Sequence, residues 1–156
     1  KMHTAQNIYA TAPLGSLIRY GNGQPRPPER FKRKLRAWEN ENGTGRLVER
    51  QPAKGTSPAY FTLRLGDFES EGVIVMVVRR LFSAESPNPF DIVETPKPGM
   101  VRVLTGHGAR EQLRFLARDM AHAERWMEDN HYSDMRAETV PDPDPVLGPD
   151  ALKQAA

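Results

Sequence analysis

The 156-residue sequence contains no cysteine. That absence excludes disulfide bonds, a thiolate nucleophile and zinc sites with sulfur ligands, and it agrees with a reducing cytoplasm. Long apolar runs are also missing, since no stretch approaches the roughly 18–20 uncharged residues of a membrane-spanning helix. The chain does not open with the charged and then apolar pattern of a secretory signal peptide. We therefore expect a cytoplasmic, one-domain protein that does not insert into membranes.

Charge is present in both signs but is unevenly distributed. The net charge is +2, yet residues 1–54 carry eleven Lys and Arg against four Asp and Glu, and the remainder carries eleven against sixteen. Six of the basic residues fall between Arg26 and Arg36, with only Glu29 among them. Such a basic first third indicates either a polyanionic partner or an acidic surface elsewhere on the same protein.

The N-terminal third predicts an arm followed by a basic helix. Residues 1–12 show weak patterning, and we expect them to be a flexible arm. Pro28 and Glu29 suit the first turn of a helix that runs over residues 29–40. Phe31, Leu35 and Trp38 follow at i, i+4 and i+7, which predicts an apolar stripe that packs on the core.

The middle of the chain predicts strands. Phe61 to Leu65 alternate apolar and polar residues, as in a half-buried strand. Val73 to Val78 form a continuous apolar run, which is typical of a strand buried on both faces. Residues 90–94 and 100–104 are two further strands whose proline-rich connection predicts a hairpin. Together they predict a small, mostly antiparallel sheet.

The last third predicts a long helix from Ala109 to Asn130 and then a tail. The core stripe of this helix would consist of Leu113, Leu116, Ala117, Met120 and Met127. Residues 137–156 are acidic and rich in proline, so we expect a disordered tail. The expected fold class is therefore α+β: a basic N-terminal helix, a sheet and a long C-terminal helix within a single domain of residues 13–136.

The segment Gly106-His107-Gly108-Ala109-Arg110 lies between the last expected strand and this long helix. Glycines allow the backbone to approach a ligand, and the N–H groups at a helix start suit phosphate. His107 can transfer protons near neutral pH, and Arg110 can bind an anion in a bidentate manner. Gly106, Gly108 and Arg110 are thus candidate phosphate-binding residues, and His107 and Arg110 candidate catalytic residues. The alternative is a turn whose glycines only relieve steric strain.

Glu124 is a third catalytic candidate. At about 100° per residue it falls in the centre of the apolar stripe of the expected long helix. A buried carboxylate there would have a raised pKa, which suits an acid or base, and it could equally bind a metal. The alternative is that the helix extends beyond the core and leaves Glu124 in water.

The basic cluster predicts contacts with the DNA backbone. Such contacts are sensitive to salt and independent of base sequence. A solvated helix face is the alternative interpretation. The candidate DNA-binding residues are Arg26, Arg30, Lys32, Arg33, Lys34 and Arg36, and Arg79-Arg80 can extend the same surface.

Three segments resemble a known family. Ala12 to Tyr20, Pro25 to Leu35 and the Gly106–Arg110 unit look like the plasmid-encoded fertility inhibition factors of the oncogenic suppression (Osa) type. Gly106, His107 and Arg110 match the glycine, polar and arginine pattern of the ParB/sulfiredoxin-like superfamily. The double arginine typical of partition proteins is absent, a departure that concerns the mode of nucleotide binding more than the fold.

The resemblance implies a bacterial ParB/sulfiredoxin-like protein with DNase and ATPase activity. Its substrate would be DNA bound for a type IV secretion system, and the consequence would be inhibition of conjugation. ATP and a divalent cation, Mg²⁺ by preference, are the implied cofactors. Relaxase-bound DNA and a secretion coupling protein are the implied partners. The rival hypothesis is a non-enzymatic protein whose basic helix docks on an acidic face of a secretion ATPase or coupling protein and blocks transfer by occupying it.

Overall fold

The computed structural model describes residues 2–71 and 73–142. None of the described helices is long and apolar enough to cross a membrane. In chain order the elements are β1 (Met2–His3), α1 (Ala5–Thr11), β2 (Leu17–Tyr20), α2 (Lys32–Glu41), β3 (Gly43–Gln51), β4 (Tyr60–Ser70), β5 (Val73–Ser83), β6 (Phe90–Glu94), β7 (Val101–Thr105), the 3₁₀ helix η1 (Gly108–Arg110), β8 (Gln112–Ala117), α3 (Met120–Asp129) and β9 (Arg136–Thr139).

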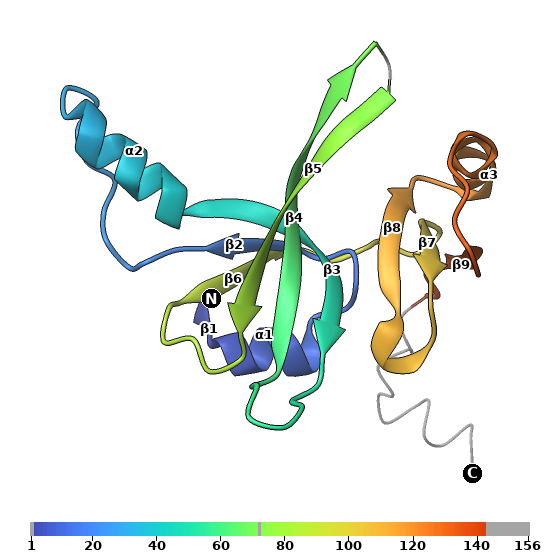
Figure 1. Cartoon of the computed structure of the whole chain (residues 1–156), viewed down its shortest axis with the longest axis horizontal. Coiled ribbons are helices and arrows are strands. Elements are labelled where there is room, and N and C mark those ends of the chain that lie inside the picture. Colours follow the sequence, from blue (N-terminus) through green and yellow to red (C-terminus); the bar gives the residue numbers. More distant parts are fainter. Residues whose placement is uncertain (1, 72, 143–156) are drawn as a thin grey trace, which may run out of the picture.

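The strands form one antiparallel sheet, which confirms the α+β class. The main path runs β1-β6-β2-β3-β8-β7-β9, while β4 branches from β3 and carries β5 on its other edge. In Figure 1, α2 and the β4–β5 hairpin project from the centre, and β7, β8, β9 and α3 form a separate group beyond β3. The basic N-terminal helix is present close to its expected range.

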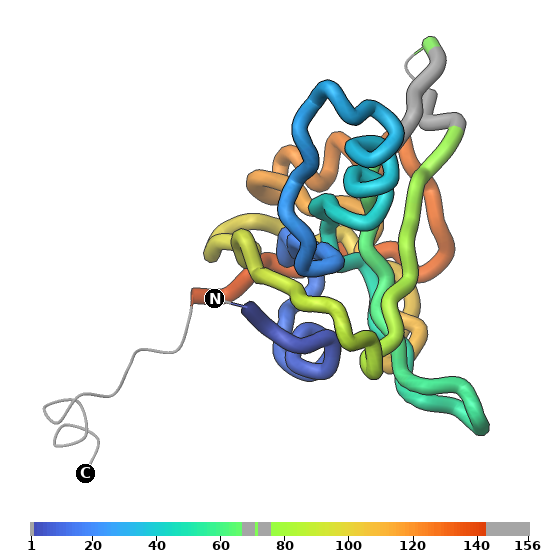
Figure 2. The backbone as a smooth tube through the Cα atoms, turned by 90° about the vertical axis from the view of Figure 1, so that its left-hand side faces the viewer, coloured from blue at the N-terminus to red at the C-terminus, as the bar shows by residue number. Residues whose placement is uncertain are grey.

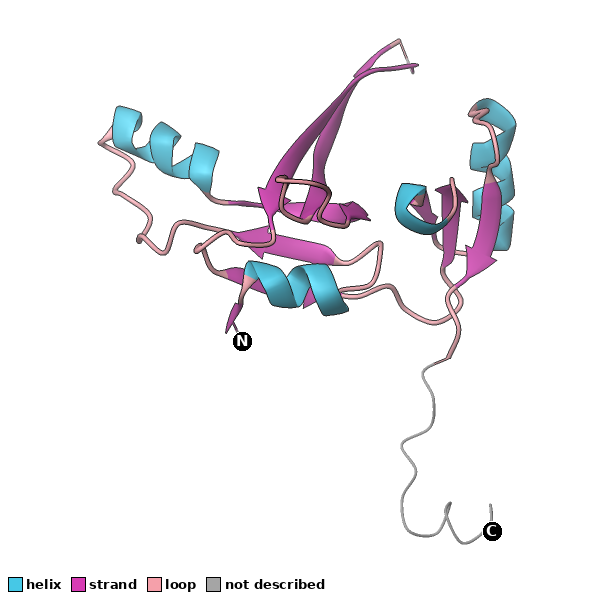
Figure 3. Cartoon of the chain, turned by 60° about the horizontal axis from the view of Figure 1, so that its bottom comes forward, coloured by secondary structure: helices cyan, strands magenta, loops and turns pink. Residues whose placement is uncertain are grey.

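Helix α1 covers one face of the sheet and belongs to the main core (Figure 3). Thr4 caps it by accepting a hydrogen bond from the Asn7 N–H. Ala5, Ile8 and Ala12 are fully buried against Phe61 and neighbouring strand residues. The expected flexible arm is therefore wrong for residues 2–12. A helix this short gave too brief a pattern to be recognised.

A second core lies between α3 and the strands β7, β8 and β9. Phe115 of β8 stacks on Trp126 of α3, with ring centroids 5.0 Å apart and planes 4° apart. The chain then returns as β9, and Val140 is buried, with its N–H donating to the Met100 carbonyl. The expected disordered tail is thus wrong over residues 137–140. Its last part, residues 143–156, lies outside the described residues.

The long helix expected over residues 109–130 is wrong in its first half, where η1 and β8 form. Its apolar spacing has a different cause. A register shift in the β7–β8 pair leaves Arg114 as an extra residue, because Leu104 pairs with Leu113 and Val103 with Phe115. Because of this bulge, the Leu113 and Leu116 side chains point to the same side of the strand. Two apolar residues three positions apart are also the spacing expected in a helix.

Two strand predictions are also corrected. Residues 90–94 and 101–105 do form strands, but β6 pairs with β1 and β2 whereas β7 pairs with β8 and β9. The proline-rich connection therefore links two parts of the sheet and is not a hairpin turn. On β5, Met76 is 53% and Val77 36% exposed. A strand buried on both faces is thus wrong at these positions, and the side chains of residues 73–75 lie outside the description.

Candidate functional site

Helix α2 carries a cationic face formed by Lys32, Arg33 and Arg36. At about 100° per residue, these side chains fall within about 100° of one another around the helix axis. All three are exposed, and together with Ala37 and Asn40 they line a shallow hollow of about 340 Å³. Within the described part of the chain, none of the three is in an ion pair. Their charges are therefore available to an anion.

The apolar stripe of α2 lies roughly on the opposite side of its axis. It does not pack on the core as expected, since α2 has no buried residue and Phe31 is 41% exposed. The loop before the helix partly covers it instead, and the Trp38 Nε1–H donates to the Gln24 carbonyl over 2.8 Å. The helix therefore projects from the sheet, as Figures 1 and 2 show, and Lys32, Arg33 and Arg36 on its cationic face are exposed.

The other three candidate DNA-binding residues are placed differently. The Arg30 guanidinium and the Lys34 ammonium lie 4.8 Å and 5.2 Å from the centroid of the Phe31 ring. Both cations thus remain at the surface beside the cationic face. Arg26 instead forms ion pairs with two glutamates, which partly neutralise its charge. These are Glu29, at 3.7 Å, and Glu39, at 3.8 Å.

Arg80 connects β5 to the end of α2. Its guanidinium lies 5.1 Å from the ring centroids of both Tyr20 and Phe82, and it donates a hydrogen bond to the Asn40 carbonyl. Asn40 is the same residue that borders the hollow on α2. Arg80 therefore adjoins the cationic face, whereas Arg79, the preceding residue of the strand, lies on the opposite side of the sheet.

The segment from Gly106 to Arg110 is a turn between β7 and β8. It contains only the single turn η1, so the helix start that was expected to hold phosphate is absent. His107 and Arg110 are exposed. Gly106 is required by the backbone: its φ is +76°, and a Cβ there would lie 2.3 Å from the Arg110 carbonyl oxygen. These observations favour the alternative in which the glycines serve the turn itself.

Arg136 of β9 holds this turn in place. Its guanidinium donates to the Gly106 carbonyl over 2.6 Å and to the Glu111 carboxylate over 2.6 Å. The same guanidinium lies 3.8 Å from Glu138 on β9. The sequence predicted no role for Arg136, Glu111 or Glu138, because the contacts of Arg136 join positions up to thirty residues apart.

Two further arginines tie α1 and its connection to the sheet. Arg50 donates to the carbonyls of Tyr9 and Ala12, and the Arg102 Nε–H donates to the Leu14 carbonyl over 2.7 Å. Burial lowers the pKa of both guanidinium groups, although nearby acidic groups act in the opposite direction. With Glu111 and Glu138 they line a polar cavity of about 250 Å³. Their carbonyl bonds identify them first as structural residues.

Glu124 is exposed on α3, about 100° around the axis from the buried Ala123. The expected burial in an apolar stripe is therefore wrong, and the alternative with Glu124 in water is confirmed. The neighbouring polar residues serve the helix end. Asp119 caps α3 by accepting from the His122 N–H, and His122 Nδ1 accepts from the Arg118 N–H.

The described residues also do not fit the implied cofactors. Among them, no three His, Asp or Glu side chains are grouped as a metal site would require. The turn at Gly106 offers no helix start to phosphate. We therefore derive no step through ATP or a divalent cation.

A comparison with protein families matches residues 3–144 to the family described as uncharacterised conserved protein UCP036055. The chain belongs to this family. No curated protein and no solved structure matches it. The function of this family member is therefore inferred from its own surface.

Proposed function

We propose that this protein binds the phosphate backbone of nucleic acid through the cationic face of α2 and the adjoining Arg80 of β5. The observation that carries the proposal is the set Lys32, Arg33 and Arg36, exposed on one side of a projecting helix and outside every ion pair of the described residues. Three cations in that arrangement repel one another and contribute nothing to the core, whereas phosphate groups would neutralise them.

The resemblance to Osa-type fertility inhibition factors extends this proposal. It implies a ParB/sulfiredoxin-like protein whose nucleic acid is DNA entering a type IV secretion system. DNA cleavage, ATP hydrolysis and inhibition of conjugation stay predictions. An acidic surface of a secretion coupling ATPase is the competing partner, since it presents the same sign of charge.

A triple variant tests the interface. Lys32→Ala/Arg33→Ala/Arg36→Ala should weaken binding to a fluorescent DNA duplex and reduce the slope of log K against log salt by about 2.7, since each phosphate that is no longer neutralised changes the slope by about 0.9. The matched control is Lys54→Ala/Lys97→Ala/Arg118→Ala, which removes the same charge at exposed positions outside α2. Fluorescence anisotropy at several salt concentrations measures both, and circular dichroism checks the fold.

An equal loss of DNA affinity in both triple variants would contradict a specific role for α2. No DNA binding by the wild-type protein, together with salt-dependent binding to the coupling ATPase, would favour the competing partner. The same samples test cleavage when Mg²⁺ and ATP are varied. If the Osa-like activity is present, Arg110→Ala, His107→Ala or Glu124→Gln should reduce it by about 10²-fold or more.

A further inference from the structure

The polar cavity of about 250 Å³ lies where β3, β7 and β9 meet the connection between α1 and β2. Its charged lining residues are Arg50 of β3, Arg102 of β7, Glu138 of β9 and Glu111, which directly precedes β8. The apolar residues that line it are Pro13, Leu14 and Leu104. The cavity therefore places two guanidinium groups and two carboxylates next to apolar surface.

The two cavity arginines hold their positive charges without a direct ion pair among the described residues. Their hydrogen bonds there go to neutral main-chain carbonyls, two from Arg50 and one from Arg102. Burial lowers the pKa of both groups, and Glu111 and Glu138 offset this only through space. A half-buried cation that lacks a counter-charge costs stability, so a bound anion would stabilise the folded protein.

Arg102 has donors that the protein does not use. Within the described residues its one hydrogen bond comes from the Nε–H, which donates to the Leu14 carbonyl over 2.7 Å. A guanidinium has five N–H donors in a planar fork, so the donors of Nη1 and Nη2 are left for a ligand. No buried side-chain nitrogen of the described residues lacks a partner, and these two nitrogens are therefore accessible. Such a fork matches the two oxygens of a carboxylate.

The glutamates limit the charge that the cavity accepts. Glu111 and Glu138 lie 2.6 Å and 3.8 Å from the guanidinium of Arg136. Together with Arg50 and Arg102, these groups leave a single positive charge, so one negative charge neutralises the cluster. A dianion such as phosphate would exceed that charge and lie next to two carboxylates. The cavity therefore favours a monoanion.

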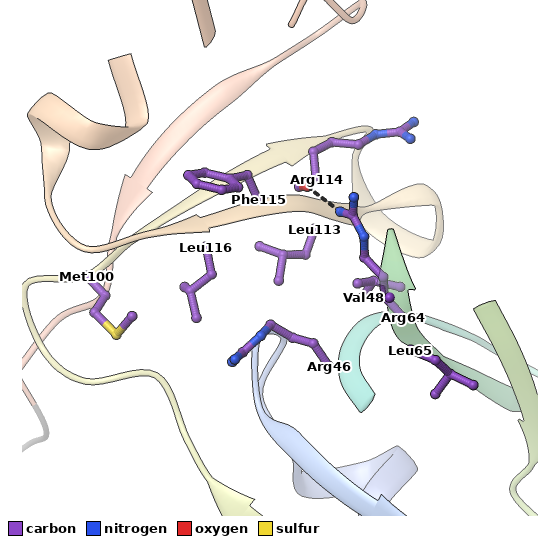
Figure 4. A pocket seen from close by; sticks show the side chains of 10 residues that line it. Arg46, Val48, Arg64, Leu65, Met100, Leu113, Arg114, Phe115 and Leu116 are labelled. Carbon is purple, nitrogen blue, oxygen red and sulfur yellow. Dashed lines mark hydrogen bonds between the residues drawn. The ribbon is translucent and has the colours of Figure 1, made fainter. Parts of the chain in front are cut away.

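A second hollow, of about 310 Å³, lies between β8 and the strands β3 and β4 and is shown in Figure 4. Its arginines already have partners. Arg46 forms an ion pair with Glu94 at 3.8 Å, and Arg64 donates to the Arg114 carbonyl over 2.8 Å. This contrast favours the cavity of Arg50 and Arg102 as the anion site.

We propose that this cavity binds a small monocarboxylic acid, with its carboxylate on Arg50 and Arg102 and its short alkyl group beside Leu14 and Leu104. A volume of about 250 Å³ equals that of about eight water molecules at about 30 Å³ each, which suits a ligand of about six to eight non-hydrogen atoms. The site is separate from the cationic face of α2. The proposal is therefore independent of nucleic-acid binding.

Thermal unfolding of the full chain tests the need for a negative charge. Sodium butyrate, with the ionic strength held constant by sodium chloride, should raise the unfolding temperature by about 3–6 °C at about ten times its dissociation constant, and the rise should saturate. Butyramide has nearly the same shape and no charge, so it should leave the unfolding temperature unchanged. No rise with butyrate, a rise that does not saturate, or an equal rise with butyramide would overturn the proposal.

Arg102→Lys separates the charge from the planar fork. The ammonium group keeps the positive charge but cannot form two parallel hydrogen bonds, so butyrate affinity should fall by about tenfold or more. The matched control is Arg118→Lys, which makes the same change at an exposed position outside the cavity and should keep the affinity. Isothermal titration calorimetry measures both variants. Unchanged affinity in Arg102→Lys would contradict the placement of the carboxylate.

A measurement on the wild-type protein keeps the proposal testable if Arg102→Lys does not fold. Nuclear Overhauser effects should join the protons of ¹³C-labelled butyrate to the methyl groups of Leu14 and Leu104, which line the cavity. Inorganic phosphate at the same concentration should leave them in place. Contacts found only with residues outside the cavity would overturn the site, and displacement of butyrate by phosphate would overturn the preference for a monoanion.

Discussion

The two faces of β3, β4 and β5 differ as sharply as two faces of one sheet can. On one face Phe61 and Leu63 are fully buried in the main core beneath α1. On the other, Arg46, Arg64 and Arg79 stand in one row across the strands. The same backbone therefore presents apolar side chains on one side and a line of positive charge on the other.

The contrast follows from the geometry of a strand. Each strand residue contributes to one face only, because side chains alternate along a strand. The α1 face gains from burial and holds the fold, whereas the arginine face contributes little to the core. Substitutions on the two faces should thus differ in their effects on unfolding.

The largest expected effect is on the α1 face. Phe61→Ala should lower the free energy of unfolding by about 3–5 kcal/mol, because it leaves a cavity among packed aromatic rings. Leu81, on the arginine face of β5, is 59% exposed, and Leu81→Ala should change stability by about 0.5 kcal/mol or less. Urea unfolding followed by circular dichroism measures both, and similar losses of stability in the two variants would contradict the assignment of the core to the α1 face.

An intermediate effect is expected at the turn between β7 and β8. Gly106 and Gly108 both have positive φ, but only at Gly106 would an added Cβ meet backbone, 2.3 Å from the Arg110 carbonyl oxygen. Gly108→Ala should lower the free energy of unfolding by about 1 kcal/mol, from backbone strain alone, and Gly106→Ala by about 2 kcal/mol or more. Thermal unfolding compares them. Equal losses would mean that the close approach at Gly106 is relieved by movement of the turn.

The smallest effect should have the opposite sign. Arg79→Gln removes one charge from the row, so the free energy of unfolding should rise by a few tenths of a kcal/mol. Urea unfolding measures the change, and a variant that is less stable than the wild type would contradict the repulsion between Arg64 and Arg79 across the strands.

Local patterns in the sequence predicted much of the secondary structure. Phe31, Leu35 and Trp38 correctly indicated the basic helix, and the alternation from Phe61 to Leu65 indicated a strand. The spacing of Leu113 and Leu116 misled, because a bulge reproduces a helical interval within a strand. Burial was harder to predict than element type, since it depends on which elements cover a surface.

The site was predicted only where it is local. The cationic face of α2 could be recognised because its residues are close in sequence. The cavity of Arg50 and Arg102 could not, because the residues that line it come from β3, β7, β9 and the connections between elements, which no local pattern brings together. His107 was selected at the start of an expected long helix and Glu124 within it. Both side chains are exposed, His107 in the turn between β7 and β8 and Glu124 on α3.

If nucleic acid binds to the cationic face of α2, the α1 face should stay clear of it. Amide chemical shifts of the ¹⁵N-labelled protein, recorded with and without a short DNA duplex, measure both. We predict shift changes at Lys32–Glu41, with Ala5–Thr11 unchanged. Shift changes centred on α1, or none at low salt with an excess of the duplex, would contradict the proposal.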